Sequence, residues 1–440
     1  MVKIIHQKNK IKTGILNNGL KYIINDNNIF SSCCIIFYIR VGAIHENDDE
    51  GGLSHLLEHM LFKGTQRYQT FMDLNKKFDM INCSVNAATS KNLTFIDMKL
   101  PYQNIEEALE LLNEMVFKSL ITMEELEKEK KVVLEEFNRT NDDSGVQLDI
   151  LTTQFNFNNH RLSNLILGTK KNIKNFTRSQ VFKFYKKYYI PSNCCISIVG
   201  NVTNNLKSKL ETIFDLKNNK KITHTIKPYE NLKIDNFLYK YNLGKVNYVS
   251  ISFPIFSILD IRKYYLDILI DILGGNMTSR LWVALREENQ LVYSFNVFYE
   301  CYEDGGFLNI TFSCVDKNVK KTIKTIMDIL EKIKKIKISK DEMDLTKKKA
   351  IMDIEINSEE SCEIGEFYGE QVILGKEINN DTKNYTDIKN YNDIKKIYET
   401  CSEDILHNIC NEFFIFSKMK LVLLGRIDKK EFNKICKNLI

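Results

Sequence analysis

The chain has 440 residues, of which 43% are hydrophobic and 27% are charged. That length allows two or three ordinary domains, and the 26 Phe and 20 Tyr argue against a disordered chain. The formal net charge of +5, from 62 basic and 57 acidic residues, is too small to indicate a nucleic-acid-binding protein.

The cysteines and the N-terminal residues bear on the compartment. The 11 cysteines form no C-x-x-C pair, so we expect free thiols in a reducing compartment. The N-terminal residues lack the apolar core of a secretory signal, and no Arg precedes Arg40, which speaks against an organelle transit peptide. No uncharged apolar run approaches the ~18 residues of a membrane span. We therefore expect an intracellular, cytoplasmic protein.

The first third of the chain alternates strand-like and helix-like segments. Residues 20–26 and 33–42 are rich in β-branched and aromatic side chains, which predicts two strands. Residues 51–62 predict a helix, and a second helix follows near 70–79. Residues 83–100 then predict a strand, a turn and another strand.

Two further helices and a buried strand follow. Residues 105–118 and 122–140 are rich in Glu, Leu and Lys and contain neither Gly nor Pro, which favours helices. Thr122 is the expected N-cap of the second helix, because Glu125 follows it three residues later. Residues 194–202 predict a buried strand that ends at a glycine turn.

A similar order of elements recurs after residue 235. Gly200 and Gly425 each close an apolar strand, which suggests that the two halves are related. The second set begins with a strand at 247–255, a helix at 262–273 and a strand at 305–314. Helices follow to about residue 360, and a final strand lies at 420–428.

This recurrence predicts an α+β fold made of two similar, tandemly duplicated domains. Each domain is expected to be a mostly antiparallel sheet covered by helices. We assign residues 1–217 to an N-terminal domain that contains the candidate site described next, and residues 235–440 to a C-terminal domain. Residues 218–234 are basic and polar with one proline, which suits a linker.

The segment GGLSHLLEHMLFKGT, residues 51–65, carries the first candidate site. On a helix, His55, Glu58 and His59 share one face at i, i+3 and i+4. Two histidines one turn apart can bind one zinc ion, and a carboxylate between them can take a proton from a water molecule. The histidine pair alone is more often an ordinary helix surface. The added glutamate gives H-x-x-E-H, the inverted zinc-protease motif.

A third zinc ligand is expected from the helix at 122–140, which offers Glu135 and Glu136. Glu136 shares a face with Glu129, Val132 and Val133, whereas Glu135 lies beside lysines on the solvated face. A carboxylate on the buried side needs a partner, so Glu136 is the better ligand. Glu129, two turns earlier, is placed to hold a ligand histidine. A charge-rich solvated helix with no role stays open from these residues alone.

These segments, with NAATS at 86–90 and EKKVVLEEF at 129–137, resemble the pitrilysin and mitochondrial-processing-peptidase family of zinc endopeptidases. The likeness is to the branch with single-length subunits. It implies that His55, His59 and Glu136 bind Zn²⁺, one ion per chain. It also implies that Glu58 acts as the general base.

The resemblance also extends to substrate contacts. The NAATS segment matches the N-A-x-T strand that pairs with the substrate backbone at the active-site edge in the family, and Asn86, Ala87 and Thr89 carry the match. Without the neighbouring motifs, an ordinary polar strand turn would be the preferred interpretation of this segment.

The second half is similar to the R-x-x-x-x-x-x-Y pattern of the family, through Arg286 and Tyr293. That likeness implies that both residues stabilise the oxyanion or hold the substrate backbone. Relatives often have a basic residue and a glycine where this chain has Asn289 and Gln290, and this departure affects the turn that leads to Tyr293.

The function that follows is a zinc-dependent endopeptidase that hydrolyses peptides or extended polypeptide segments. The alternative is a catalytically silent structural or binding subunit of the same fold. The resemblance implies a homodimer or pairing with a related subunit, and a partner chain is a third possible requirement for activity. We expect no nucleic-acid partner and no membrane-spanning segment.

Overall fold

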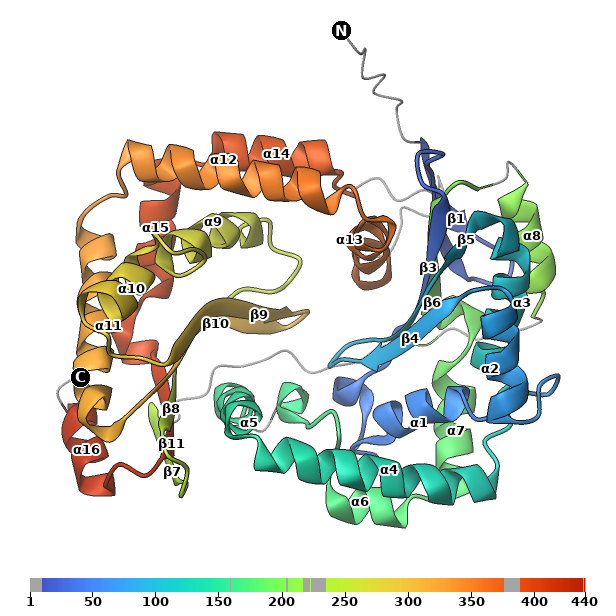
Figure 1. Cartoon of the computed structure of the whole chain (residues 1–440), viewed down its shortest axis with the longest axis horizontal. Helices are drawn as coiled ribbons and strands as arrows, with labels where there is room; N and C mark the ends of the chain where they lie inside the picture. Colours follow the sequence, from blue (N-terminus) through green and yellow to red (C-terminus); the bar gives the residue numbers. More distant parts are fainter. Residues whose placement is uncertain are drawn as a thin grey trace, which may run out of the picture. The chain divides into compact units, whose positions relative to one another are not determined.

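The computed structural model shows a mixed α+β chain (Figure 1). The described residues form two compact units, each built from several stretches of sequence. The structure describes residues 10–158, 160–202, 205–216, 222, 235–375, 388–437 and 439. The first unit draws on Met1–Phe137, Asn164–Ile226 and Ile356–Ile388, and the second on Asn138–Ser163, Lys227–Glu355 and Lys389–Ile440.

The described strands of the first unit form a six-stranded sheet in the order β1-β2-β6-β3-β5-β4. Only the β2–β6 pair in this sheet is parallel, and the other neighbours are antiparallel. The central strands β3 and β6 are buried along almost their whole length, because both of their faces are covered. The strands are β1 (Lys10–Ile15), β2 (Lys21–Asp26), β3 (Ser32–Ile39), β4 (Ser84–Thr89), β5 (Thr94–Pro101) and β6 (Cys194–Gly200).

The described strands of the second unit form a five-stranded sheet in the order β7-β11-β8-β10-β9. In this sheet the β7–β11 pair is parallel and the other pairs are antiparallel. Apart from β1, the two sheets therefore repeat one order and one set of directions, and Gly200 and Gly425 end equivalent strands. The predicted α+β fold with two similar sheets is confirmed. The strands are β7 (Phe237–Tyr241), β8 (Asn247–Ile255), β9 (Ser294–Tyr302), β10 (Gly305–Cys314) and β11 (Lys420–Gly425).

Helices cover one face of the first sheet and enclose the main hydrophobic core of the first unit. Phe37 of β3 lies in this core, with its ring 5.8 Å from Phe117 and 6.0 Å from Phe214. The helices that this unit takes from the first half of the sequence are α1 (Leu53–Leu61), α2 (Phe71–Met80), α3 (Ile105–Phe117), α4 (Met123–Asp142), α6 (Lys170–Asn175), α7 (Arg178–Tyr188) and α8 (Leu206–Ile213).

Helix α13 (Ser361–Leu374) covers the opposite face of the first sheet, against β3 and β6 (Figure 1). Two glycines on α13 allow this close approach. A Cβ atom added at Gly369 would lie 2.4 Å from Cε2 of Tyr38, and one added at Gly365 would lie 3.1 Å from Cδ1 of Ile36. Although α13 follows the second sheet's strands β7–β10 in sequence, it packs in the first unit.

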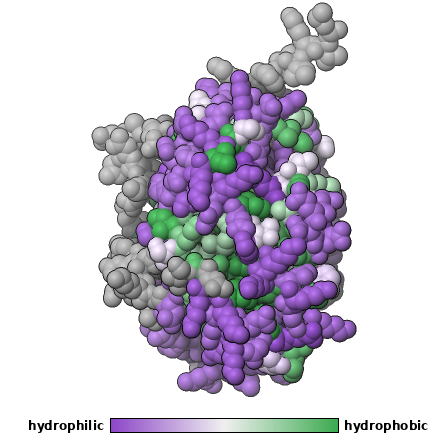
Figure 2. Space-filling view, turned by 90° about the vertical axis from the view of Figure 1, so that its left-hand side faces the viewer, coloured by the Kyte–Doolittle hydropathy of each residue, from purple (hydrophilic) through white to green (hydrophobic). Residues whose placement is uncertain are grey.

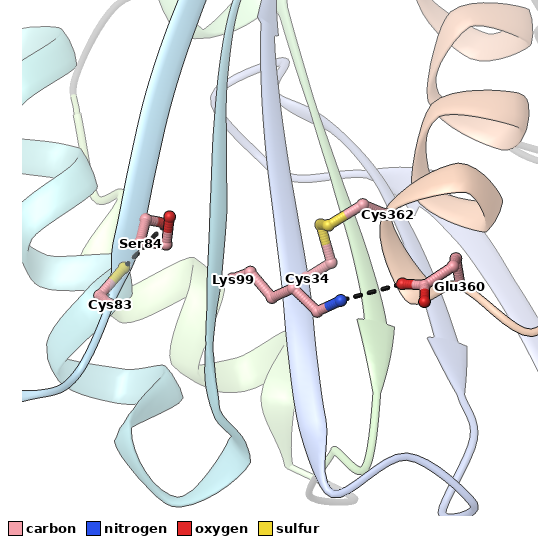
Figure 3. Close-up of a disulfide and its surroundings, with 6 residues drawn as sticks. All are labelled: Cys34, Cys83, Ser84, Lys99, Glu360 and Cys362. Atoms are coloured by element: carbon pink, nitrogen blue, oxygen red, sulfur yellow. Dashed lines mark hydrogen bonds and ion pairs between the residues drawn. A yellow bond between two sulfur atoms is a disulfide. The ribbon is translucent and has the colours of Figure 1, made fainter.

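A disulfide joins Cys34 of β3 to Cys362 of α13, across a sequence separation of 328 residues (Figure 3). Beside it, Lys99 of β5 forms an ion pair with Glu360 at 2.9 Å. The prediction that all cysteines are free thiols is therefore wrong for this pair, because folding brings together two residues that lie far apart in the chain. The cysteines no longer support a reducing compartment, and the cytoplasmic location stays a prediction.

Helix α5 (Ser144–Asn156) comes from the first half of the sequence and packs in the second unit. It precedes β6 in sequence but packs on β8 and β11 of the second sheet. Asn156 Nδ2 donates a hydrogen bond to Ser252 Oγ at 2.9 Å, and Leu148 lies in a cluster with Val422 and Leu424. Each half of the sequence thus contributes one helix to the other unit. The contiguous domains at 1–217 and 235–440 stay a prediction, and the linker at 218–234, apart from Ile222, lies outside the described residues.

Among the remaining helices of the second unit, α9 packs against β9, α15 against β8 and α16 against β7. The face seen in Figure 2, on the side of α11 and α16, is mostly hydrophilic around a smaller hydrophobic area. Within the described part of the chain, no helix combines the length and apolarity that crossing a membrane would need. These helices are α9 (Lys263–Leu273), α10 (Arg280–Trp282), α11 (Val319–Lys335), α12 (Lys340–Asn357), α14 (Tyr391–Thr400), α15 (Glu403–Phe413) and α16 (Lys429–Lys437).

Candidate metal centre

The start of α1 is fixed by a buried carboxylate and a glycine. Glu46 accepts hydrogen bonds from the backbone N–H groups of Gly52 at 2.8 Å and Ser54 at 2.7 Å. Burial raises the pKa of Glu46 to about 7, although both bonds oppose the shift. Gly52 has a φ of +96°, and a Cβ there would lie 2.7 Å from the Leu167 carbonyl oxygen. Together these contacts set the direction of the helix that carries His55.

The H-x-x-E-H motif lies on α1, as the sequence predicts. His55 and Glu58 are each 8% exposed, and the rings of His55 and His59 lie 4.7 Å apart. The five apolar residues of the helix are fully buried on the core side. The polar side of α1 is therefore also enclosed, which distinguishes it from an ordinary surface helix.

Glu136 of α4 reaches both histidines. Its Oε2 lies 3.6 Å from His55 Nε2 and 3.7 Å from His59 Nε2. One donor atom from each of the three residues lies within 4.8 Å of the other two, and no other such group of His, Cys, Asp or Glu side chains occurs among the described residues. Glu135 is exposed, in agreement with the choice between the two glutamates.

The predicted burial of Val132 on α4 is wrong. Val133 is buried as predicted, but Val132 is 49% exposed. At 3.6 residues per turn, Val132 lies about 60° around the helix from Glu129, whereas Val133 and Glu136 lie closer to the line of Glu129. The buried stripe of α4 is narrower than predicted and leaves Val132 at its solvent-facing edge.

Glu129 contacts a ligand candidate from behind. Its Oε2 lies 3.1 Å from His59 Nδ1, and its Oε1 lies 2.8 Å from Lys63 Nζ. Burial acts to raise the pKa of Glu129, but the hydrogen bonds from His59 and Lys63 outweigh it and hold the pKa below its usual range. Lys63 was not selected from the sequence, where it is one lysine among many.

The two histidines experience different electrostatic environments. Burial, with His59 as a neighbour, lowers the pKa of His55 to about 4, so its ring is neutral and able to act as a ligand. Burial also acts to lower the pKa of His59, but Glu129, Glu58 and Glu136 raise it overall. A position where three carboxylates favour a proton is also one that attracts a metal cation.

Glu58 is held by the end of strand β4. Thr89 Oγ1 donates a hydrogen bond to Glu58 Oε2 at 2.7 Å. Burial raises the pKa of Glu58, although the Thr89 hydroxyl opposes the shift. The sequence pattern selected Thr89 for a substrate strand, and the structure gives its hydroxyl a contact with the candidate base.

Strand β4 is an edge of the first sheet among the described strands. Ala87 packs against the main core, and Asn86, on the other face of the strand, hydrogen-bonds through its side chain to Asp97 of β5. One backbone edge of β4 is therefore open to pairing within the described part of the sheet.

Arg286 and Tyr293 belong to the second unit. Arg286 Nη1 donates to the backbone oxygens of Val292 at 3.1 Å and Tyr293 at 2.5 Å, which holds the turn before β9. The Tyr293 side chain is 63% exposed. Gln290 has a φ of +49°, in the left-handed region that favours glycine.

Known protein families match two stretches of the chain. Residues 22–170 match the model described as insulinase (peptidase family M16), and residues 175–350 match the peptidase M16 inactive domain. A Bacillus subtilis (strain 168) protein named uncharacterized zinc protease YmxG is 32% identical over 301 residues, which cover 68% of this chain and 73% of that protein. The chain belongs to the M16 peptidase family, which confirms the pitrilysin and processing-peptidase resemblance.

More distant relatives extend the match to most of this M16 chain. The beta subunit of the mitochondrial-processing peptidase from Dictyostelium discoideum is 23% identical over 393 residues, covering 85% of this chain and 82% of that protein. A protease from Helicobacter pylori has a TM-score of 0.86 at 22% identity, with 94% of this chain and 99% of that chain covered. The M16 inactive domain from Pseudomonas fluorescens has the same TM-score of 0.86 at 16% identity, covering 95% and 98%. These two structures share the fold.

Proposed function

We propose that this M16 chain is a zinc-dependent endopeptidase that hydrolyses peptides or extended polypeptide segments. The observation that carries the proposal is the convergence of three donor atoms, from His55, His59 and Glu136, within 4.8 Å of one another. The carboxylate of Glu58 lies on the same helix face, between the two histidines in sequence. Relatives named as zinc proteases support the same activity.

The donor set suits zinc. Tetrahedral bonds of about 2.0–2.1 Å place ligand atoms roughly 3.3 Å apart, close to the 3.6 Å and 3.7 Å between Glu136 and the two histidines. Two imidazoles and one carboxylate are a known catalytic set that leaves one position open. A zinc ion held there would polarise the scissile carbonyl and lower the pKa of a water molecule.

Glu58 is the proposed general base. The Thr89 hydroxyl occupies one of its carboxylate oxygens, which leaves the other free to accept a proton from the attacking water. Burial, which raises the pKa of Glu58, helps the carboxyl group keep that proton until it passes to the leaving amine. Thr89 thus orients the Glu58 carboxylate, while His55, His59 and Glu136 would hold the zinc ion beside it.

The open edge of β4 is the proposed substrate contact. An extended peptide can add to this edge through backbone hydrogen bonds, a mode of recognition that demands no single sequence. Ala87 packs into the core and Asn86 bonds to Asp97, so both keep the strand flat and in register. We retain Arg286 and Tyr293 as the groups that hold the substrate backbone or the oxyanion.

A catalytically silent subunit of the same fold is the second candidate. The match of residues 175–350 to a model described as an inactive domain favours it, and the relative named as a beta subunit is one part of a larger peptidase. They also favour pairing with a second copy or a related subunit. The complete donor set in the first unit supports the enzyme instead, and zinc content distinguishes the two candidates.

The Glu58→Gln variant tests the enzyme directly. Peptide cleavage should fall by about 10²–10⁴-fold, because the amide cannot take the proton. Zinc binding should remain, since Glu58 is not among the three donors. A chelator should abolish cleavage by the parent. Cleavage by Glu58→Gln at the parental rate would overturn the mechanism.

A further inference from the structure

We infer that Lys63 is a positioning residue of the metal centre, which acts through Glu129 to hold His59 with Nε2 facing the other donors. This inference rests on the proposed zinc site. Lys63 lies two residues after the end of α1, and its backbone N–H donates to Met60 O at 3.2 Å. It therefore follows directly from the helix that carries both histidines.

The two oxygens of Glu129 are shared between two donors. Oε1 lies 2.8 Å from Lys63 Nζ, and Oε2 lies 3.1 Å from His59 Nδ1. The Glu129 side chain is 6% exposed, so water supplies little alternative solvation. A carboxylate in this position needs both partners, and the loss of one leaves a buried oxygen unpaired.

Lys63 is itself held from the other side. Its Nζ lies 5.0 Å from the centre of the Phe71 ring, at the first residue of α2. The ammonium group is thus fixed between an aromatic face and Glu129. The end of α1, the start of α2 and the middle of α4 meet at this one charge.

The consequence concerns the tautomer of His59. In the neutral ring, donation from Nδ1 to Glu129 leaves Nε2 without a proton and free to act as a ligand. Nε2 is the atom that lies 3.7 Å from Glu136. By contrast, His55 Nδ1 has no hydrogen-bond partner among the described residues, so of the two rings only His59 is oriented by a hydrogen bond at Nδ1.

A lysine that merely stabilised the fold would not change how the protein binds metal. The test is therefore the zinc affinity of the refolded or purified metal-free full chain, measured by competition with a chromophoric chelator. The absorption spectrum of the Co²⁺-substituted protein is a second readout, because it reports the geometry around the ion.

Lys63→Met keeps most of the side-chain length and removes the charge, and Lys63→Arg restores a donor. Lys63→Met should weaken zinc binding on the order of tenfold and alter the Co²⁺ spectrum, and Lys63→Arg should recover much of both. Lys128→Met is the matched control, because Lys128 pairs with Glu124 and Glu125 on the exposed side of α4. Parental affinity and spectrum in Lys63→Met would overturn the inference.

A double-mutant cycle separates an action through Glu129 from a general effect on folding. In the Glu129→Gln background, Lys63→Met should cause no further loss of zinc affinity. An equal loss in both backgrounds would show that Lys63 acts by another route and would overturn the inference. If the parental chain binds no zinc, the proposed function fails; if the parent binds zinc and Lys63→Met matches it, only this inference fails.

Discussion

The two units use one scaffold for two different purposes. In the first unit, the helix after β3 carries His55, which is one of three donors that suit a metal, and Glu58, the candidate base. In the second, the helix after the equivalent strand β8 is α9, and its Asp267 accepts hydrogen bonds from Tyr299 and Tyr398, both at 2.9 Å. The fold is shared, and the side chains placed on it decide whether a site is open or closed.

The contacts from the edge strands repeat the comparison. Thr89 of β4 donates to Glu58 of α1, and Tyr299 of the equivalent edge strand β9 donates to Asp267 of α9. In the second unit a second tyrosine also bonds to the carboxylate, which leaves it a structural group. In the first unit the carboxylate keeps one oxygen for chemistry.

The largest expected effect comes from the third donor of the first unit. Glu136→Gln should lower zinc affinity by more than about 100-fold, beyond the usual loss for residues behind the ligands, and abolish cleavage. Glu135→Gln is the matched control, because its side chain is exposed on the same helix. Metal analysis and a peptide assay check both variants. Equal zinc binding by the two variants would remove Glu136 from the site.

The exchanged helices offer a second contrast. In the first unit a disulfide fastens α13, whereas α5 in the second is held by contacts such as the bonds from Lys420 Nζ to the Phe155 and Asn156 oxygens, at 2.9 Å and 3.0 Å. Cys34→Ser combined with Cys362→Ser should lower the free energy of unfolding by about 2–4 kcal/mol. Thermal or urea unfolding measures it.

Thiol labelling provides the control for that prediction. The unfolded, unreduced parent should label at nine cysteines, since nine are free, and at 11 after reduction. Labelling of all 11 without a reductant would show that the bridge is absent.

In the second unit, Asp267→Ala should weaken the fold without affecting metal binding. The partly buried hydroxyls of Tyr299 and Tyr398 would each lose an acceptor, and the free energy of unfolding should fall by about 1–3 kcal/mol. Zinc content should match that of the parent, as measured by metal analysis of the folded protein. A loss of zinc in this variant would contradict the assignment of the site to the first unit.

The smallest effect is expected at Thr89. Thr89→Val should lower cleavage about tenfold, because a hydrogen bond to a charged group contributes roughly 1.5 kcal/mol or more. Thr89→Ser should retain activity, since it keeps the hydroxyl. Zinc affinity should not change in either variant. If Thr89→Ser loses as much activity as Thr89→Val, the hydroxyl is not what holds the base.

Much of the fold could be predicted because the buried strands are long apolar runs. The strands that the sequence did not reveal, β1, β7 and β9, all lie at sheet edges among the described strands. An edge strand such as β7 is only partly buried, so its hydrophobic pattern is weak. The order of elements predicted two similar halves, but the exchange of α5 and α13 depends on tertiary packing.

In the candidate site, too, some residues follow from local sequence patterns and others depend on tertiary packing. His55, Glu58 and His59 were placed together by helix periodicity, and Glu136 was selected by the faces of a second helix. The contacts of Lys63 depend on how α1, α2 and α4 meet, so no local pattern indicates them. Glu46 reaches Gly52 and Ser54 from the irregular segment before α1, which has no helix or strand period. The Cys34–Cys362 bridge spans 328 residues and could not be read from spacing.

The most direct test of the central claim is an anomalous diffraction map at the zinc edge from crystals of the zinc-loaded parent. The account predicts one strong peak per chain, in contact with Nε2 of His55, Nε2 of His59 and the carboxylate of Glu136. No peak at that position, or a peak bound by other residues, would contradict the assignment.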